Sequence, residues 1–225
     1  MKRAFFVTGT DTEVGKTLIS AALVHALAHS GLKAAGMKPV AAGCTRVGGR
    51  LLSGDTERLS AAGNVILAPE IANPYAFEAP LAPHIAARQA GEHIALAPIK
   101  AAFEAALREV DVLIVEGVGG FRVPLNENED SADLAVMLGL PLILVVGMRL
   151  GCLNHALLTA EAIASRGLTL AGWVANNLDS DMLAQEDNFS TLSELLPAPC
   201  LVMVPRLRRV DFDLVSACLE VKLLR

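Results

Sequence analysis

The start of the chain constrains the fold most strongly, because an apolar strand there runs straight into a glycine-containing loop and a helix. Residues 3–8 form an apolar, aromatic-rich run, and residues 9–17 read GTDTEVGKT. Backbone N–H groups of such a loop can curl around an anion while the helix N-terminus points at it. This order predicts a phosphate-binding loop in which Lys16 reaches the β- and γ-phosphates of a nucleotide and Thr17 binds Mg²⁺. The two glycines of the loop are separated by five residues, one more than in the standard pattern.

Short apolar strands alternate with helical stretches along the rest of the chain. This alternation predicts an α/β fold with a mostly parallel sheet, right-handed crossovers and helices on both faces. We expect one domain over residues 1–225. Residues 41–91 are rich in Gly and Pro, and we expect this segment to be the least regular and to contact the substrate. The expected strands are 3–8, 34–40, 111–115, 142–146, 170–175 and 201–204, and the expected helices are 15–30, 98–109, 132–138, 152–165 and 181–196.

Charge and hydropathy argue against nucleic-acid and membrane partners. The net charge is −5, and the one small basic cluster is Arg206, Arg208 and Arg209, which we interpret as a solvated or locally paired turn. The most lipophilic stretch, residues 132–148, contains a charged residue and is interrupted by a Gly-Leu-Pro turn, so we expect no membrane span there. The N-terminus enters a strand without a signal-peptide pattern, so we expect a cytoplasmic protein.

Three charged residues, two of them at expected strand ends, could complete a nucleotide site. Glu116 ends a four-residue apolar run, and burying it without a cation or donor would be costly. Asp55 is either a further acidic partner or a helix N-cap, and taken alone the N-cap role is the more typical. Lys38 precedes Pro39 at the end of the second expected strand. It is either a second cation for an anionic acceptor near the γ-phosphate or a solvated lysine at a strand end.

Taken together, these motifs resemble the dethiobiotin synthetase family of ATP-dependent ligases, over nearly the whole chain. The longer phosphate loop is typical of that family. The glycines after the acidic strand end, in residues 115–120, and the LGCLNH sequence of residues 150–155 are also typical of it. The other matching segments are 7–17, 36–40, 73–75, 83–84, 143–159 and 168–176.

The resemblance implies an ATP-driven closure of a cyclic urea in biotin biosynthesis. The family's substrates are 7,8-diaminononanoate (diaminopelargonate), CO2 and ATP, and the reaction passes through a carbamate and its mixed anhydride with phosphate. By the resemblance, Lys16 steadies the β- and γ-phosphates, and Lys38 steadies the carbamate and the transferred phosphoryl group. The resemblance further implies that Thr17, Asp55 and Glu116 hold Mg²⁺ and that Asn176 recognises adenine. The full nucleotide-binding set that it implies is Glu13, Val14, Gly15, Lys16, Thr17, Leu18, Asp55, Glu116, Gly117, Val118, Gly119, Asn176, Asn177, Pro205, Arg206 and Leu207.

The family also builds its site across a homodimer, so the resemblance implies that a second subunit binds the carboxylate tail of the substrate. Residues 151–154 open a helix whose free N–H groups could accept that carboxylate. Two positions depart from the family pattern. Ala42 stands where a serine is common, which removes a hydroxyl contact, and Phe121-Arg122 stands where relatives can have an aromatic pair. The expected substrate contacts are Thr12, Lys38, Ala42, Gly151, Cys152, Leu153 and Asn154.

Two other functions compete with this one. A synthetase domain of corrin amidation would be expected to carry an attached glutaminase domain, for which 225 residues leave no room. A partitioning ATPase that binds partner proteins would carry an extra lysine early in the loop, where this chain has Thr10-Asp11-Thr12. The presence of Lys38 also favours small-molecule chemistry over partner binding.

Overall fold

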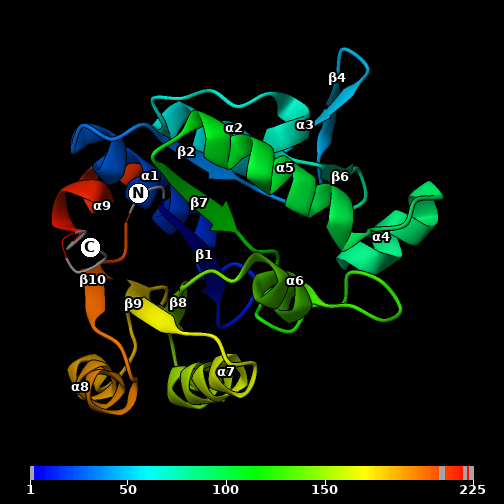
Figure 1. Ribbon diagram of the computed structural model, residues 1–225. Coiled ribbons are helices and arrows are strands. Elements are labelled where there is room, and N and C mark those ends of the chain that lie inside the picture. Colours follow the sequence, from blue (N-terminus) through cyan, green and yellow to red (C-terminus); the bar gives the residue numbers. More distant parts are fainter. Residues whose placement is uncertain (1–2, 208–210, 220–221, 223–225) are drawn as a thin grey trace.

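Six parallel strands form the centre of the computed structural model, which describes residues 3–207, 211–219 and 222 (Figure 1). Every pairing within this sheet is parallel, which confirms the predicted α/β fold. The order across the sheet is β10-β9-β8-β1-β7-β2. The strands are β1 (Arg3–Gly9), β2 (Ala34–Met37), β7 (Val112–Glu116), β8 (Leu142–Met148), β9 (Leu170–Asn177) and β10 (Cys200–Val204).

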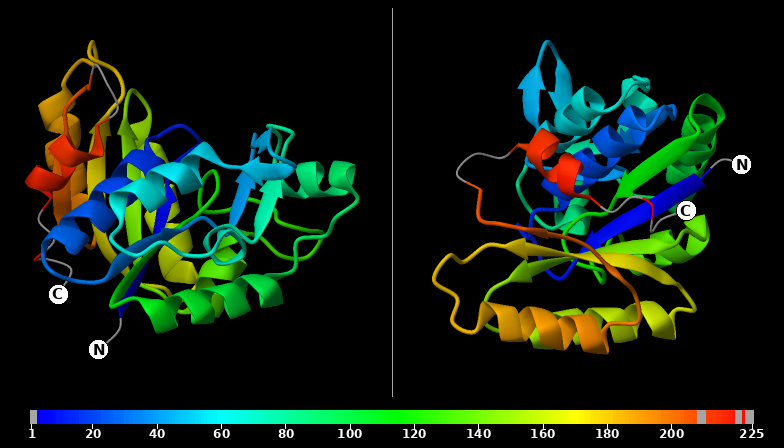
Figure 2. Two further views of the ribbon diagram at one scale, coloured as in Figure 1. Left: turned by 90° about the horizontal axis from the view of Figure 1, so that it is seen from above. Right: turned by 90° about the vertical axis from the view of Figure 1, so that its left-hand side faces the viewer.

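Side chains of these strands alternate between two hydrophobic layers, one on each face of the sheet. In β1, Phe6 packs into one layer while Phe5 and Val7 pack into the other, as the two-residue period of a strand requires. Figure 2 shows helices on both sides of the sheet, with α7 and α8 next to each other on one face. That face is covered by α5 (Leu96–Glu109), α6 (Ser131–Leu138), α7 (Cys152–Ser165) and α8 (Gln185–Leu195), and the other by α1 (Lys16–His29), α2 (Gly54–Ala62) and α9 (Phe212–Cys218).

The helix after the glycine loop, α1, runs nearly as predicted. It stops before Gly31, whose φ of 88° suits a residue without a Cβ. Helix α7 has the predicted bounds, and α6 begins one residue early because Asp130 caps it, accepting from the backbone N–H groups of Ala132 and Asp133. Helix α8 begins at Gln185, four residues later than expected, and α9 was not predicted.

Residues 41–91, expected to be the least regular segment, contain short elements that the sequence did not predict. The segment forms a small parallel sheet of β3 with β6, a hairpin of β4 and β5, and three helices, and Figure 1 shows the hairpin and α4 standing apart from the main sheet. Strands of three residues carry too little periodicity to be recognised in a sequence. The additional elements are β3 (Val40–Ala42), β4 (Thr45–Val47), β5 (Arg50–Leu52), β6 (Tyr75–Phe77), α3 (Pro69–Ala72) and α4 (Pro83–Ala90), together with α2.

The expected strand 34–40 is really two strands in two sheets. β2 ends at Met37, and the chain then leaves the main sheet, because the N–H of Lys38 donates to Ala72 O at 2.8 Å and Pro39 has no N–H to donate. β3 begins at Val40 and pairs with β6 instead. Lys38 therefore sits at the switch between the two sheets.

Two sequence expectations concern the surface and the chain end. Within the described residues, no helix has the length and apolar character needed to cross a membrane, and residues 132–148 form α6, a turn and β8. Arg206 is exposed and donates to Leu178 O, as a locally paired turn would, while Arg208 and Arg209 lie outside the described residues.

Candidate active site

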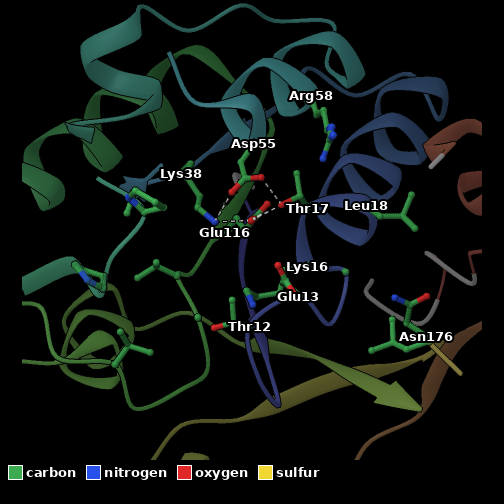
Figure 3. Close-up of a pocket in the computed structure, with 18 of the residues that line it drawn as sticks. Thr12, Glu13, Lys16, Thr17, Leu18, Lys38, Asp55, Arg58, Glu116 and Asn176 are labelled. Atoms are coloured by element: carbon green, nitrogen blue, oxygen red, sulfur yellow. Dashed lines mark hydrogen bonds and ion pairs between the residues drawn. The ribbon is translucent and has the colours of Figure 1, made fainter. Parts of the chain in front are cut away.

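A cleft of about 1140 Å³ opens at the carboxyl ends of the parallel strands (Figure 3). Parallel strands present these ends at one edge of the sheet, which brings together the loop after β1, Lys38 after β2, Glu116 of β7 and Asn176 of β9. The small-sheet region adds an outer wall. The lining residues are Thr12, Glu13, Gly15, Lys16, Thr17, Leu18, Lys38, Ala42, Asp55, Arg58, Pro80, Leu81, Ala82, Pro83, Glu116, Val118, Gly119, Val123, Asn176, Asn177, Leu178, Pro205, Arg206 and Leu207.

The glycine loop is held in its curled shape by backbone conformation and by one asparagine. Gly15 has φ of 93°, and a Cβ built on it would lie 2.2 Å from Nδ2 of Asn176. That same Nδ2 donates to Val14 O at 2.8 Å, and Val14 is fully buried behind the loop. Only glycine therefore fits at position 15, both for its φ and for the close approach of Asn176.

The start of α1 is arranged to bind an anion. Its hydrogen-bond ladder begins with Ile19 donating to Gly15 O at 3.1 Å, and no side chain caps the helix. The N–H groups of the first turn consequently point into the cleft with the positive end of the helix dipole. The Lys16 ammonium folds back over the loop and donates to Asp11 O at 2.9 Å. A further contact that the sequence did not predict fixes the loop from outside, where Arg149 Nη2 lies 2.6 Å from Asp11 Oδ2.

Lys38 lies at the centre of a buried polar network with the two acidic residues (Figure 3). Its Nζ is 2.6 Å from Glu116 Oε1, 3.0 Å from Asp55 Oδ2 and 3.1 Å from Gly117 O, so its three protons have three acceptors. Thr17 Oγ1 lies 2.8 Å from both Asp55 Oδ1 and Glu116 Oε1. Lys38 is 4% exposed and Glu116 is fully buried, so the interpretation of Lys38 as a solvated lysine is wrong.

This environment shifts the pKa values of the two lysines in opposite directions. The pKa of Lys16 is lowered to about 8, first by burial and next by the nearby charge of Lys38, while the surrounding carboxylates act in the opposite direction. Burial also acts to lower the pKa of Lys38, but Glu116 and Asp55 outweigh it and the pKa is raised. Burial would raise the pKa of Asp55, yet Lys38 and the Thr17 hydroxyl hold it below its usual value. At neutral pH Lys38 and Asp55 are therefore both charged.

The donor set at Thr17 fits a hard divalent cation. It offers two carboxylates and a hydroxyl, the oxygen ligands that Mg²⁺ prefers. Glu116 Oε2 is buried and has no hydrogen-bond partner among the described residues, which leaves a carboxylate oxygen available to a cation. Within the same part of the chain, His, Cys, Asp and Glu do not gather in any group of three or more that could hold a metal.

Most of the residues predicted for the site do meet in the cleft. Asp55 is not a helix N-cap, because Ser53 precedes α2 and Asp55 is its second residue, with its carboxylate on Thr17 and Lys38. Gly117 is buried behind the lining and contributes its carbonyl to Lys38. Residues 151–154, in contrast, lie at the start of α7 and do not line this chain's own cleft.

The backbone of Cys152 is not available as the resemblance implied. Cys152 is buried and its N–H already donates to Arg149 O at 3.0 Å. No side chain caps α7, so the following residues of the first turn, Leu153 and Asn154, keep the N–H groups that could bind an anion. Of the two departures from the family pattern, Ala42 lines the cleft, whereas Phe121 is buried and Arg122 pairs with Asp130 away from it.

Sequence reasoning expected residues 41–91 to contact the substrate but did not single out Arg58 or the wall formed by residues 80–83. Arg58 lies three residues after Asp55, so predicting a helix from residue 54 would have placed both side chains on one face. Residues 80–83 read PLAP and carry no chemical signature. Only their tertiary position brings them to the cleft.

Comparison with known proteins agrees with this geometry. A family model described as an AAA domain matches residues 3–213. The chain is 53% identical over 218 residues to the ATP-dependent dethiobiotin synthetase BioD of Aromatoleum aromaticum, which covers 97% of each chain. It is 53% identical over 216 residues to the protein of that name from Ralstonia nicotianae, covering 96% of this chain and 94% of the relative. For Cellvibrio japonicus the identity is 50% over 219 residues, with 97% and 96% covered.

Two solved structures share the fold at low sequence identity. The MinC:MinD cell division protein complex of Aquifex aeolicus aligns with a TM-score of 0.56 and 14% identity, covering 95% of this chain and 86% of that chain. A ParA family ATPase of Chlorobium tepidum aligns with a TM-score of 0.53 and 14% identity, covering 92% and 86%. These likenesses support the fold alone, whereas the relatives at 50–53% identity align over 96–97% of this chain. The chain belongs to the ATP-dependent dethiobiotin synthetase family of carbon–nitrogen ligases.

Proposed function

We propose that this chain closes the ureido ring of dethiobiotin from 7,8-diaminononanoate and CO2, through a carbamate and a carbamic–phosphoric anhydride. The observation that carries the proposal is the position of Lys38. Its ammonium is buried between Glu116 and Asp55, next to the phosphate loop, so a second cation stands ready beside the phosphates of a nucleotide. A pure nucleotide-binding switch has no need for such a group.

The proposed reaction has three bond-forming steps. One amine of the diamine adds to the carbon of CO2 and loses a proton, which gives the carbamate. A carbamate oxygen then attacks the γ-phosphorus of ATP, the bond to the β-phosphate oxygen breaks, and ADP leaves. The second amine finally attacks the carbonyl carbon of the anhydride, the carbon–oxygen bond to phosphate breaks, and phosphate departs as the ring closes with loss of a proton.

The two lysines take different parts in this sequence. Lys16 and the first-turn amides of α1 bind the β- and γ-phosphates, where charge accumulates during transfer. Lys38 faces the incoming carbamate and neutralises its charge, which reduces the repulsion between two anions that must come into contact. Thr12 and Ala42 line the part of the cleft where we place the diamine.

Thr17, Asp55 and Glu116 are the residues that would hold Mg²⁺. When bound, this ion supplies positive charge to the phosphate oxygens. Because Lys38 shares both carboxylates, a divalent cation there would leave the lysine free to turn toward the acceptor. Asn176, Asn177 and residues 205–207 line the opposite end of the cleft, where we place adenine. There the buried Oδ1 of Asn177 has no hydrogen-bond partner among the described residues and suits an exocyclic amine.

An assay of ADP release tests the proposal. ADP should form only when both the diamine and bicarbonate are present, and carbon-13 from labelled bicarbonate should appear in the cyclic urea. One ring should form per ADP. ATP turnover that is unaffected by leaving out either compound would refute the proposal.

We also propose a homodimer in which the start of α7 binds the carboxylate tail of the substrate held by the partner subunit. The first turn of α7 is uncapped, lies outside this chain's own cleft, and follows Leu150, which is 93% exposed. An exposed leucine beside an anion-binding helix start suits a contact with a second copy. Gly151 has φ of 93°, so a side chain there would disturb this turn.

Subunit complementation separates a shared site from one contained in a single chain. Lys16→Gln and Gly151→Val variants should each have little activity, and mixing them under exchange conditions should restore part of it, because one of the two sites in a mixed dimer has both halves intact. A mixture no more active than its components would refute the shared site. Sedimentation of the separate variants shows whether each still forms dimers.

A further inference from the structure

The cleft contains a cation, Arg58, that has no part in the roles described so far. It lies on α2, one turn after Asp55, and lines the cleft together with Thr17 and Leu18. Figure 3 shows its side chain reaching from α2 toward the first turn of α1, on the other side of Thr17 from Lys16. Across the described ranges, no hydrogen bond or ion pair joins its guanidinium to another side chain.

The packing of α2 explains why Arg58 must point this way. Its neighbour Leu59 is fully buried, and its side chain fills the space above Gly36, so that face of the helix is committed to the core. Asp55 and Arg58 are three residues apart and share another face, and the Asp55 carboxylate fixes that face on Thr17 at 2.8 Å. Arg58 is therefore carried over the start of α1 by the same helix that brings in a candidate metal ligand.

Two sets of donors then converge on one space. The uncapped N–H groups of the first turn of α1 come from one side, and the five N–H groups of the Arg58 guanidinium come from the other. A phosphate bound at the helix N-terminus would lie between them. Arginine suits such a position, because its planar fork can bind two phosphate oxygens at once.

The position along the cleft indicates which phosphates are involved. In Figure 3 Lys38 lies at one end and Asn176 at the other, with Leu18 toward Asn176, and Arg58 reaches down between Thr17 and Leu18. The transferred phosphoryl group belongs at the Lys38 end in the proposed function. We propose that Arg58 is a nucleotide-binding residue whose guanidinium closes over the phosphates that remain in ADP, opposite Lys16. This inference rests on the proposed placement of the nucleotide in the cleft.

The test measures ADP and ATP affinity by calorimetry for Arg58→Gln and Arg58→Lys, with Mg²⁺ present. Removing a charge-assisted contact in Arg58→Gln should weaken the binding of ADP and of ATP by a similar factor, about 10- to 100-fold. Arg58→Lys should lose less affinity. The KM for the diamine should remain within about threefold. Arg88→Gln is the matched control, since Arg88 is also an exposed helical arginine but lies outside this cleft.

Two results would overturn the inference. Affinities of Arg58→Gln for both ADP and ATP within twofold of those of the unmodified protein remove the contact altogether. Weaker ATP binding with unchanged ADP binding places Arg58 on the transferred phosphate instead.

The same measurements on Lys16→Gln distinguish a failure of this inference from a failure of the proposed function. If neither Lys16→Gln nor Arg58→Gln changes ADP affinity, the nucleotide does not bind in this cleft. If only Lys16→Gln does, the placement of the nucleotide stands and the inference about Arg58 is wrong. Thermal unfolding of each variant without nucleotide shows that the fold is unchanged.

Discussion

The two ends of the cleft are built on different parts of the molecule. The phosphate end, residues 9–18 with Asn176, stands on strands of the main sheet, and its loop is tied to β9 through the hydrogen bond from Asn176 to Val14. The small-sheet end, residues 38–42 with 80–83, stands on strands of three residues, and Leu81 in its wall is 40% exposed. The comparison shows one end of the cleft shaped by backbone geometry and the other formed by a few side chains on short strands. In the proposed function these ends hold the nucleotide and the acceptor, respectively.

The two lysines show the same division in their electrostatics. Lys16 is shielded from water and has Lys38 nearby, so its pKa falls to about 8. A bound anion would favour its charged form. Lys38 is more deeply buried, yet its pKa is raised because two carboxylates surround it. The charge of Lys16 would be stabilised by phosphates, which suits nucleotide binding. The charge of Lys38 is already balanced by carboxylates, which suits a role during the reaction.

Gly15→Ala should give the largest effect, because it distorts the backbone of the phosphate end. The added Cβ would lie 2.2 Å from Asn176 Nδ2, at φ of 93°. We expect a loss of about 1–3 kcal/mol in the free energy of unfolding from strain and, by calorimetry, the loss of most ADP binding.

Gly91→Ala is the control for that variant. Gly91 also has positive φ, 72°, but a Cβ there meets nothing within 4 Å. In denaturant unfolding, Gly91→Ala should have a lowered free energy of unfolding because of backbone strain, while its ADP affinity stays unchanged. A Gly15→Ala protein that binds ADP as well as Gly91→Ala does would break the idea that backbone shape fixes the nucleotide.

The pH dependence of ADP binding should be the next largest effect. Lys16 binds phosphate in its protonated form, so in the nucleotide-free protein that form is lost as pH rises through about 8. ADP affinity should then fall by up to about tenfold per pH unit above that value, measured by calorimetry from pH 7 to 9.5. Lys38 keeps its charge over this range because its pKa is raised. Lys16→Arg, which stays charged, should flatten the profile, and the same slope in both proteins would assign it to another group.

Ala42→Ser should give the smallest effect. It changes a residue at the small-sheet end of the cleft. A hydroxyl restored in the wall of the cleft should contribute about 0.5–1.5 kcal/mol to binding of the diamine. This corresponds to a KM for the diamine roughly two- to tenfold lower, with the KM for ATP unchanged, measured by steady-state kinetics. A change confined to ATP would show that Ala42 belongs to the phosphate end.

The same contrast explains what could be predicted from the sequence. Most of the phosphate end was predictable because residues 9–18 are contiguous and chemically distinctive, and buried strands such as β8 are recognisable as unbroken apolar runs. Lys38, Asp55 and Glu116 were recognisable one by one, but their meeting depends on strand order. Glu116 and Lys38 are 78 residues apart in sequence and adjacent only because β2 pairs with β7. The small sheet, α2 and hence Arg58 were missed because short elements are fixed by tertiary packing.

The most direct test of the account compares nucleotide binding and ring closure in Lys38→Met, which keeps the length of the side chain and removes its charge. With Mg²⁺ present, ADP affinity should stay within about threefold, because the phosphate end is built without Lys38. Ring closure at saturating substrates should fall at least about 100-fold. Equal losses in binding and ring closure would contradict the division of the cleft and make Lys38 a structural residue, and undiminished ring closure would remove it from the reaction.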